Sequence, residues 1–129
     1  MFYYSLNNQS PKASFKEATI KGQSPDKGLY FPETIPSLPK KFIEDINQYS
    51  KEEIAFKIIQ PYVGDEIPET ELKKIISETI NFDFPLIKIN DNIFSLELFH
   101  GPNACIQRCW SKIYESLSRA FCKKIMISK

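Results

Sequence analysis

Apolar and polar positions alternate along two neighbouring stretches, and this pattern predicts a β-hairpin. The stretches are residues 84–89 and 93–99, and the polar turn 90–92 joins them. In the second stretch Leu96 and Leu98 point to one side and their neighbours point to the other, which is the period of a half-buried strand. We therefore expect one face of the hairpin to be covered.

The second predicted strand ends at His100, the only histidine in the chain. Gly101 and Pro102 follow, and both disfavour continuation of a strand. A polar side chain at the end of a strand, directly before a glycine, is a frequent site geometry in α/β proteins. The segment 95–102 is therefore the first candidate for a functional site.

Apolar residues at helical spacing, together with capping signals, predict three to four short helices before the hairpin. Ser14 and Ser50 each open an S-x-x-E capping box, which satisfies free N–H groups where a helix begins. Gly22 is placed to end the first helix, and Pro61 to end the third. The predicted helices span residues 14–21, 39–49, 50–60 and 69–80.

Two aromatic-rich segments near the N-terminus, Phe2–Ser5 and Leu29–Phe31, indicate short strands. The chain has 129 residues, enough for one modest domain with a core. We therefore expect a small single α+β domain with three to four short helices, short N-terminal strands and a β-hairpin. The pattern of the tail, described below, adds a C-terminal helix.

The adjacent carboxylates Asp65 and Glu66 allow two interpretations. They could serve catalysis or bind a metal ion, or they could stabilise a helix, because negative charge is favoured at a helix N-terminus. The sequence favours the second interpretation, since the predicted helix 69–80 follows shortly after them.

Composition and charge exclude several classes of function. Lys and Arg total 17 against 16 Asp and Glu, whereas nucleic-acid binders usually carry a clear basic excess. No stretch approaches the roughly 20 apolar residues of a membrane span. The segment Met1–Ser5 lacks the basic and apolar regions of a signal peptide. We expect a cytoplasmic protein that binds neither nucleic acid nor membrane.

All three cysteines, Cys105, Cys109 and Cys122, lie in the tail. An odd number in a cytoplasmic chain argues against a disulfide framework. Together with His100 they could form a four-ligand zinc site, but their spacing matches no common zinc pattern. The pattern favours cysteines that act as small apolar side chains, so we predict no metal site.

Several segments resemble, in the same order, the N-terminal domain of threonine synthase. The most specific is Leu96–Pro102, which reads LELFHGP. The supporting segments are, in chain order, Ser14–Ala18 (SFKEA), Asp26–Pro32 (DKGLYFP) and Val63–Pro68 (VGDEIP). The resemblance covers residues 3–102, about four fifths of the chain.

This resemblance implies a lyase of threonine biosynthesis that depends on pyridoxal 5'-phosphate (PLP). The family converts O-phosphohomoserine and water into threonine and phosphate. In the family, HGP is followed by T-x-A-F-K-D, whose lysine holds the cofactor as a Schiff base. The residues of this chain nearest to that position are Phe99, His100, Gly101 and Pro102. The resemblance gives His100 a supporting role near the site rather than a catalytic one.

The chain departs from the family directly after Pro102. Residues 103–108 read N-A-C-I-Q-R, which places Gln107 where the family has its lysine. A carboxamide cannot form a Schiff base, and the resemblance covers none of the family's catalytic and cofactor-binding domains. We therefore expect no catalytic residue, no intact cofactor site and no bound PLP in this chain alone.

The abrupt boundary at Pro102 indicates a change of reading frame, which the genetic code can test. Read one base later, the codons from Asn103 onward permit T-L-A-F-K-D-V-G and then A-R-F-M, the family's continuation. Most of these residues are only permitted, because the codons of the given residues are degenerate. The glycine is forced, because Trp110 is encoded by TGG alone and the shifted codon therefore begins with GG. We interpret residues 1–102 as the threonine-synthase-like domain and residues 103–129 as an out-of-frame amphipathic helical tail.

The tail also has the pattern of an evolved amphipathic helix, which leaves a second interpretation open. The shifted frame meets a stop codon at Met126, so one extra base does not restore a long enzyme. The alternative is a stand-alone, non-catalytic binding module whose tail helix covers the face that other domains would meet. The tail positions at helical spacing are Ile106, Cys109, Trp110, Ile113, Tyr114, Leu117, Phe121 and Cys122.

Overall fold

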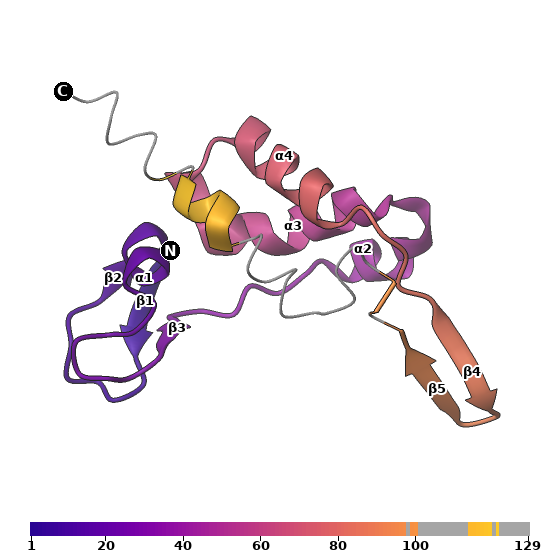
Figure 1. The fold of residues 1–129 in the computed structure, drawn as a ribbon, viewed down its shortest axis with the longest axis horizontal. Coiled ribbons are helices and arrows are strands. Elements are labelled where there is room, and N and C mark those ends of the chain that lie inside the picture. Colours follow the sequence, from indigo (N-terminus) through magenta and orange to yellow (C-terminus); the bar gives the residue numbers. More distant parts are fainter. Residues whose placement is uncertain (98, 101–113, 120, 122–129) are drawn as a thin grey trace.

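Residues 1–97, 99–100, 114–119 and 121 are described by the computed structural model in Figure 1. The first elements are β1 (Phe2–Ser5), β2 (Ala13–Ser14), α1 (Phe15–Lys21), β3 (Tyr30–Pro32), α2 (Lys40–Glu44) and the 3-10 helix η1 (Ile46–Gln48). They are followed by α3 (Lys51–Val63), the 3-10 helix η2 (Gly64–Glu66), α4 (Glu69–Thr79), β4 (Leu86–Asn90) and β5 (Ile93–Leu96). Residues 114–119 and 121 are helical and are called the C-terminal helix below. The predicted α+β fold class is confirmed, and none of the described helices is long and apolar enough to cross a membrane.

Strand β1 is the centre of an antiparallel sheet with the order β2-β1-β3. Tyr3 pairs with Ala13 on one side and with Pro32 on the other. The strand predicted at Phe2–Ser5 is confirmed, and β3 begins one residue later than predicted. Strand β2 is not predicted from the sequence. It is only two residues long and ends at the capping Ser14, which is too short for an alternating pattern of apolar and polar residues.

The turn before β3 is held together by the carboxylate of Asp26. This carboxylate accepts hydrogen bonds from Ser5 Oγ at 2.6 Å, from the Gln9 amide at 3.0 Å and from the Gly28 amide at 2.9 Å. The bond from Ser5 is the largest cause that lowers the pKa of Asp26 to about 2. A Cβ at Gly28 would lie 2.1 Å from Ser5 Oγ, which explains the glycine in the Asp26–Pro32 segment.

Both predicted capping boxes are confirmed. Ser14 Oγ accepts from the Glu17 amide at 3.1 Å, and the Glu17 carboxylate accepts from the Ser14 amide at 3.0 Å. Ser50 and Glu53 make the same pair of bonds at the start of α3, at 3.2 and 2.8 Å. These local bonds fix where α1 and α3 begin. Gly22, with φ 67°, ends α1 as predicted.

The single helix predicted over residues 39–49 is wrong. Helix α2 ends at Glu44, and the chain turns through Asp45 into η1. The break brings the rings of Phe42 and Tyr49 within 5.0 Å of each other, measured between centroids. In a continuous helix, seven residues would separate these positions by about 10 Å along the axis. The packing of the two rings therefore requires the helix to break.

The prediction that the third helix ends before Pro61 is wrong, because α3 continues through Pro61 to Val63. A proline inside a helix costs about 3 kcal/mol, because it removes one backbone hydrogen bond and crowds the preceding turn. Packing of the last turn offsets this cost. Val63 is fully buried, and the Tyr62 carbonyl accepts a hydrogen bond from the Tyr3 hydroxyl at 2.9 Å. Burial of Tyr3 raises its pKa to about 12.

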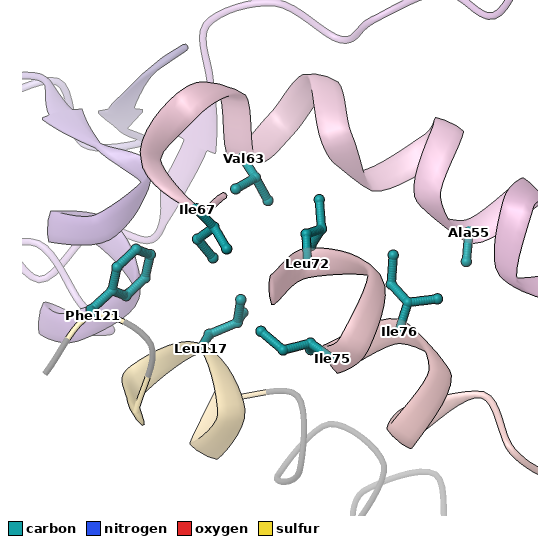
Figure 2. Packing of buried hydrophobic residues seen from close by; sticks show 8 residues of the cluster. All are labelled: Ala55, Val63, Ile67, Leu72, Ile75, Ile76, Leu117 and Phe121. Carbon is teal, nitrogen blue, oxygen red and sulfur yellow. The ribbon is translucent and has the colours of Figure 1, made fainter. Parts of the chain in front are cut away.

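The hydrophobic core lies where α3, α4 and the C-terminal helix meet, as Figure 2 shows. Helix α4 contributes the face that its spacing predicts, and the C-terminal helix contributes Leu117 and Phe121. The ring of Phe15 lies 6.1 Å from that of Phe121 and 5.9 Å from that of Tyr3, which joins the core to the N-terminal sheet. The buried cluster consists of Ala55, Val63, Ile67, Leu72, Ile75, Ile76, Leu117 and Phe121.

The predicted helical tail is confirmed for the tail residues that the structure describes. Leu117 and Phe121 are buried, whereas Tyr114 is about half exposed. This is the difference between two faces that an amphipathic helix requires. The remaining predicted positions lie outside the described residues; they are Ile106, Cys109, Trp110, Ile113 and Cys122.

Glu66 caps helix α1 rather than the helix that follows it. Its carboxylate oxygens accept hydrogen bonds from the amides of Phe15 and Lys16, both at 2.9 Å. The sequence favours a helix-stabilising role for Asp65 and Glu66 over a catalytic or metal-binding one. For Glu66 this role is confirmed, because its negative charge does lie at a helix N-terminus. The sequence predicts the wrong helix, since the helix that Glu66 caps begins 51 residues earlier.

Replacing Glu66 by alanine is expected to lower the free energy of unfolding by about 1.5–3 kcal/mol, because two amides lose a charged acceptor. Asp65→Ala is the matched control, since Asp65 is exposed and its loss should change stability by less than about 0.5 kcal/mol. Urea denaturation followed by circular dichroism measures both values. Equal effects of the two substitutions would contradict the capping role.

The hairpin strands β4 and β5 are exposed on both faces. They pair Leu86 with Leu96 and Lys88 with Phe94, and a bulge interrupts the register after Lys88. The expected half-buried strand is therefore wrong: every residue of β4 is exposed, and in β5 only Ser95 is partly covered. Figure 1 shows the hairpin projecting away from the helices. The alternation of apolar and polar residues predicts which side chains of a strand share a face. It does not predict whether another part of the chain packs on that face.

Candidate functional site

An open pocket of about 870 Å³ lies at the base of the hairpin. Three segments meet there: the first residue of α3, the loop between α4 and β4, and the residues after β5. The backbone amide of Glu97 donates to the Pro85 carbonyl at 3.0 Å and closes the base of the hairpin. The pocket is lined by Lys51, Asn81, Phe82, Asp83, Phe84, Pro85 and His100.

An ion pair between Lys51 and Asp83 forms one wall of the pocket. Lys51 Nζ lies 2.5 Å from Asp83 Oδ1 and 4.8 Å from the centroid of the Phe84 ring. The hydrogen bond from Lys51 is the first cause that lowers the pKa of Asp83, and the charges of Lys51 and His100 also contribute. Because the capping box at Ser50 fixes the start of α3, it also places Lys51 at the pocket.

His100 also lines the pocket and is oriented by two neighbours. Its Nε2 lies 2.6 Å from Glu97 Oε2, and its ring stacks on that of Phe99 with 4.7 Å between centroids. A carboxylate bound to one ring nitrogen holds an imidazole in a fixed orientation. Glu97 and Phe99 can therefore hold the His100 ring in place at the pocket.

The predicted site residues divide into those that the structure describes and those that it does not. His100 lines the pocket, and Phe99 is exposed beside it. Gly101, Pro102 and Gln107 lie outside the described residues. The same is true of the three cysteines of the alternative zinc site, and no group of three potential metal ligands occurs among the residues described.

Sequence reasoning missed Lys51, Asn81 and Asp83. For Lys51 the sequence predicts only a place in the first turn of a helix, and Asp83 falls in a loop before a predicted strand. The one signal available was the aromatic-acidic-aromatic segment Phe82-Asp83-Phe84, which is unusual for a solvent-exposed loop. Their common pocket depends on contacts between distant segments, which local patterns do not record.

Comparison with known proteins adds an independent observation. The sequence model of the family described as "Threonine synthase N terminus" matches residues 2–80, more than half of the chain. The chain belongs to the threonine synthase family. This confirms the resemblance to the N-terminal domain of threonine synthase, and the supporting segments between Ser14 and Pro68 lie within the matched range.

Individual members of the threonine synthase family show how much of the protein this chain represents. The threonine synthase of Serratia marcescens is 32% identical over 102 residues, which make up 79% of this chain and 24% of that protein. The chain thus spans about a quarter of the length of the curated relatives it matches. The matched length agrees with a resemblance that runs to about Pro102.

Two solved threonine synthases share the fold. The structure of PLP-bound threonine synthase from Brucella melitensis superposes with a TM-score of 0.89 at 27% identity, covering 96% of this chain and 28% of that one. The threonine synthase structure from yeast gives a TM-score of 0.84 at 31% identity, with 96% and 27% covered. The similarity of shape therefore extends over more of the chain than the similarity of sequence.

Proposed function

We propose that this chain is the amino-terminal portion of a PLP-dependent threonine synthase and is inactive by itself. The complete enzyme would convert O-phosphohomoserine and water into threonine and phosphate. Membership of the threonine synthase family carries the proposal, and the PLP in the Brucella melitensis relative supports the cofactor. A cytoplasmic location stays a prediction from the sequence.

The residues of the pocket do not fit PLP on their own. Lys51, the lysine that lines it, is bound to Asp83 at 2.5 Å and covers the Phe84 ring. Free amides at a helix N-terminus can bind a phosphate, but at the start of α3 the Ser50–Glu53 capping box already occupies two such groups. None of the glycines Gly22, Gly28 and Gly64 lines the pocket. The described residues thus contain neither a free amine nor a phosphate cradle at this place.

The position of the pocket is consistent with the rim of a larger site. His100 lies on its wall, and in the family the cofactor lysine follows the HGP segment closely. In this chain Gln107 stands in the position of that lysine. The proposal assigns His100 and Glu97 a supporting role in the complete enzyme, with the reactive lysine supplied by the family's continuation.

The division of the chain follows from the same observations. Residues 1–102 carry the family's segments, and residues 103–129 are out-of-frame sequence whose neighbouring frame permits T-L-A-F-K-D. The relatives match 79% of the chain, which supports the proposed division. Because an amphipathic pattern can arise in either frame, the tail can contribute apolar residues to the core without belonging to the family's sequence.

The purified chain, mixed with PLP and O-phosphohomoserine, is expected to release no phosphate above the rate without protein. Its absorption spectrum with PLP should show only the reversible, non-specific reaction of surface lysines. The yeast threonine synthase under the same conditions is the positive control. Stoichiometric PLP binding that is abolished by replacing a single lysine, or steady phosphate release, would contradict the proposal.

A second candidate is a stand-alone, non-catalytic binding module. One observation favours it: Leu117 and Phe121 fill the core closely, as in a tail shaped by selection. Affinity purification of the chain from its own cells separates the two candidates. A specific partner unrelated to threonine synthesis, bound at micromolar strength or better, would favour the binding module.

A further inference from the structure

A second pocket, of about 410 Å³, lies between helix α3 and the connector that leads into α2, and we call it the connector pocket. It shares no residue with the pocket at the base of the hairpin. Eight of the eleven described residues that line it are apolar or aromatic, among them Leu38, Phe42, Phe56, Pro61 and Tyr62. A concave site of this size, with a mainly apolar lining and a few polar groups, is the usual form of a small-molecule site.

Two locally unfavourable features of the fold meet at the connector pocket. One is Pro61, which lies inside α3 and lines the pocket. The other is the break between α2 and η1, which lets the ring of Tyr49 pack on that of Phe42, another lining residue. In a stable fold, departures from local preference are concentrated at functional sites. Two such features at one pocket are therefore expected for a binding site.

The polar side chains of the connector pocket are all hydrogen-bond donors. They are Ser37, Lys57 and Gln60, and none of them makes a side-chain hydrogen bond to another described residue. The described lining contains no carboxylate. An apolar cavity whose polar groups can all donate matches a ligand with an apolar body and an anionic group.

Lys57 carries the only charge among the described residues that line the pocket. Its Nζ lies 5.6 Å from the centroid of the Phe42 ring and 5.7 Å from that of Tyr49, so the ammonium group is held beside a lining residue. Glu53, the acidic residue one turn earlier in α3, is bound to the Ser50 amide at 2.8 Å and does not line the pocket. The Lys57 charge is therefore available to a ligand.

We propose that the connector pocket binds a small aromatic carboxylate, whose ring lies against Phe42, Phe56 and Tyr62 and whose carboxylate pairs with Lys57. One cation with two neutral donors balances a single negative charge, whereas a phosphate dianion requires more donors than this lining supplies. This inference goes beyond the proposed function and does not depend on it, because the connector pocket is separate from the one that His100 lines.

The test is a titration of the isotope-labelled 129-residue chain with naphthoate, followed through the backbone amide shifts in two-dimensional NMR spectra. Naphthoate is expected to bind one-to-one with a Kd of about 0.1–1 mM, the range for a ligand of its size. The shift changes should be centred on residues 36–42 and 56–62, which include the pocket lining. Naphthamide, which has the same ring but no charge, should bind at least about fivefold more weakly.

Two substitutions test the role of charge in the connector pocket. Lys57→Met should lower the affinity for naphthoate at least about fivefold and leave that for naphthamide unchanged, because it removes the cation but keeps an apolar side chain. Ser37→Glu should have the same selective effect, since it adds a carboxylate at an exposed lining position. Lys21→Met is the matched control, because Lys21 is exposed in α1, outside the pocket, and should change neither affinity.

Unchanged binding of naphthamide shows that each variant retains a folded pocket, and if Lys57→Met does not fold, Ser37→Glu alone decides. The proposal would be overturned by the absence of saturable shift changes at millimolar naphthoate, by equal affinities for naphthoate and naphthamide, or by shift changes centred on the hairpin. Naphthyl phosphate distinguishes the two kinds of anion. If it bound more tightly than naphthoate, the assignment of a carboxylate would be wrong.

Discussion

Replacing Phe121 by alanine is expected to lower the free energy of unfolding by about 3–5 kcal/mol, the usual cost of deleting a fully buried phenyl ring. Phe121 is 1% exposed and is among the largest fully buried side chains of the described residues. Its ring packs edge-on against Phe15, which in turn contacts Tyr3 of the N-terminal sheet. The substitution therefore leaves a cavity where the helices and the sheet meet.

Tyr114→Ala is the matched control for this prediction. Tyr114 lies on the same helix but is about half exposed, so its loss should change stability by less than about 1 kcal/mol. Urea denaturation, monitored by circular dichroism, gives both values. Similar effects of the two substitutions would show that the C-terminal helix does not pack in the core as described. Because stability depends on packing and not on the origin of a sequence, this result is independent of the reading-frame hypothesis.

The second large effect concerns activity. A chimera of residues 1–102 joined to the yeast enzyme from its T-x-A-F-K-D motif onward is expected to form threonine from O-phosphohomoserine. Replacing the lysine of that motif by glutamine, the residue at position 107 here, should reduce the rate at least about a thousandfold, as loss of a covalent catalytic group does in other enzymes. Coupled phosphate release measures both rates.

The control for the chimera is lysine replacement by glutamine in the intact yeast enzyme, which should cause the same loss. An inactive chimera that is folded and binds PLP would show that residues 1–102 no longer function as a threonine synthase amino terminus. Equal rates for the lysine and glutamine chimeras would refute the assignment of the missing lysine to position 107.

Features encoded by neighbouring residues could be predicted from the sequence. The capping boxes at Ser14 and Ser50 and the end of α1 at Gly22 each depend on contacts within four residues, and each is confirmed. The apolar face of α4 follows from spacing alone. These signals are local, so the sequence carries them in readable form.

Features set by distant contacts could not be predicted. The ring pair Phe42–Tyr49 breaks a predicted helix, and the packing of Val63 carries α3 past Pro61. Glu66 caps a helix that begins 51 residues earlier. In each case tertiary contacts outweigh a local preference of a few kcal/mol or less.

The candidate site shows the same division. His100 stands out in the sequence because it is the only histidine and precedes Gly101 and Pro102. Lys51 and Asp83 do not stand out, because their meeting at 2.5 Å depends on how α3 and the loop after α4 pack. Family resemblance locates the segment that should lead to the cofactor lysine, and it predicts that Gln107 stands in the position of this lysine.

The DNA sequence across the codons for Pro102 to Trp110 tests most directly that this chain begins as a threonine synthase and then leaves the family's reading frame. The account predicts codons that spell T-L-A-F-K-D-V-G when read one base later, including AAA for the lysine. Codons for Gln107 and Arg108 that give no lysine in the shifted frame would contradict it, and residues 103–129 would then be an evolved tail.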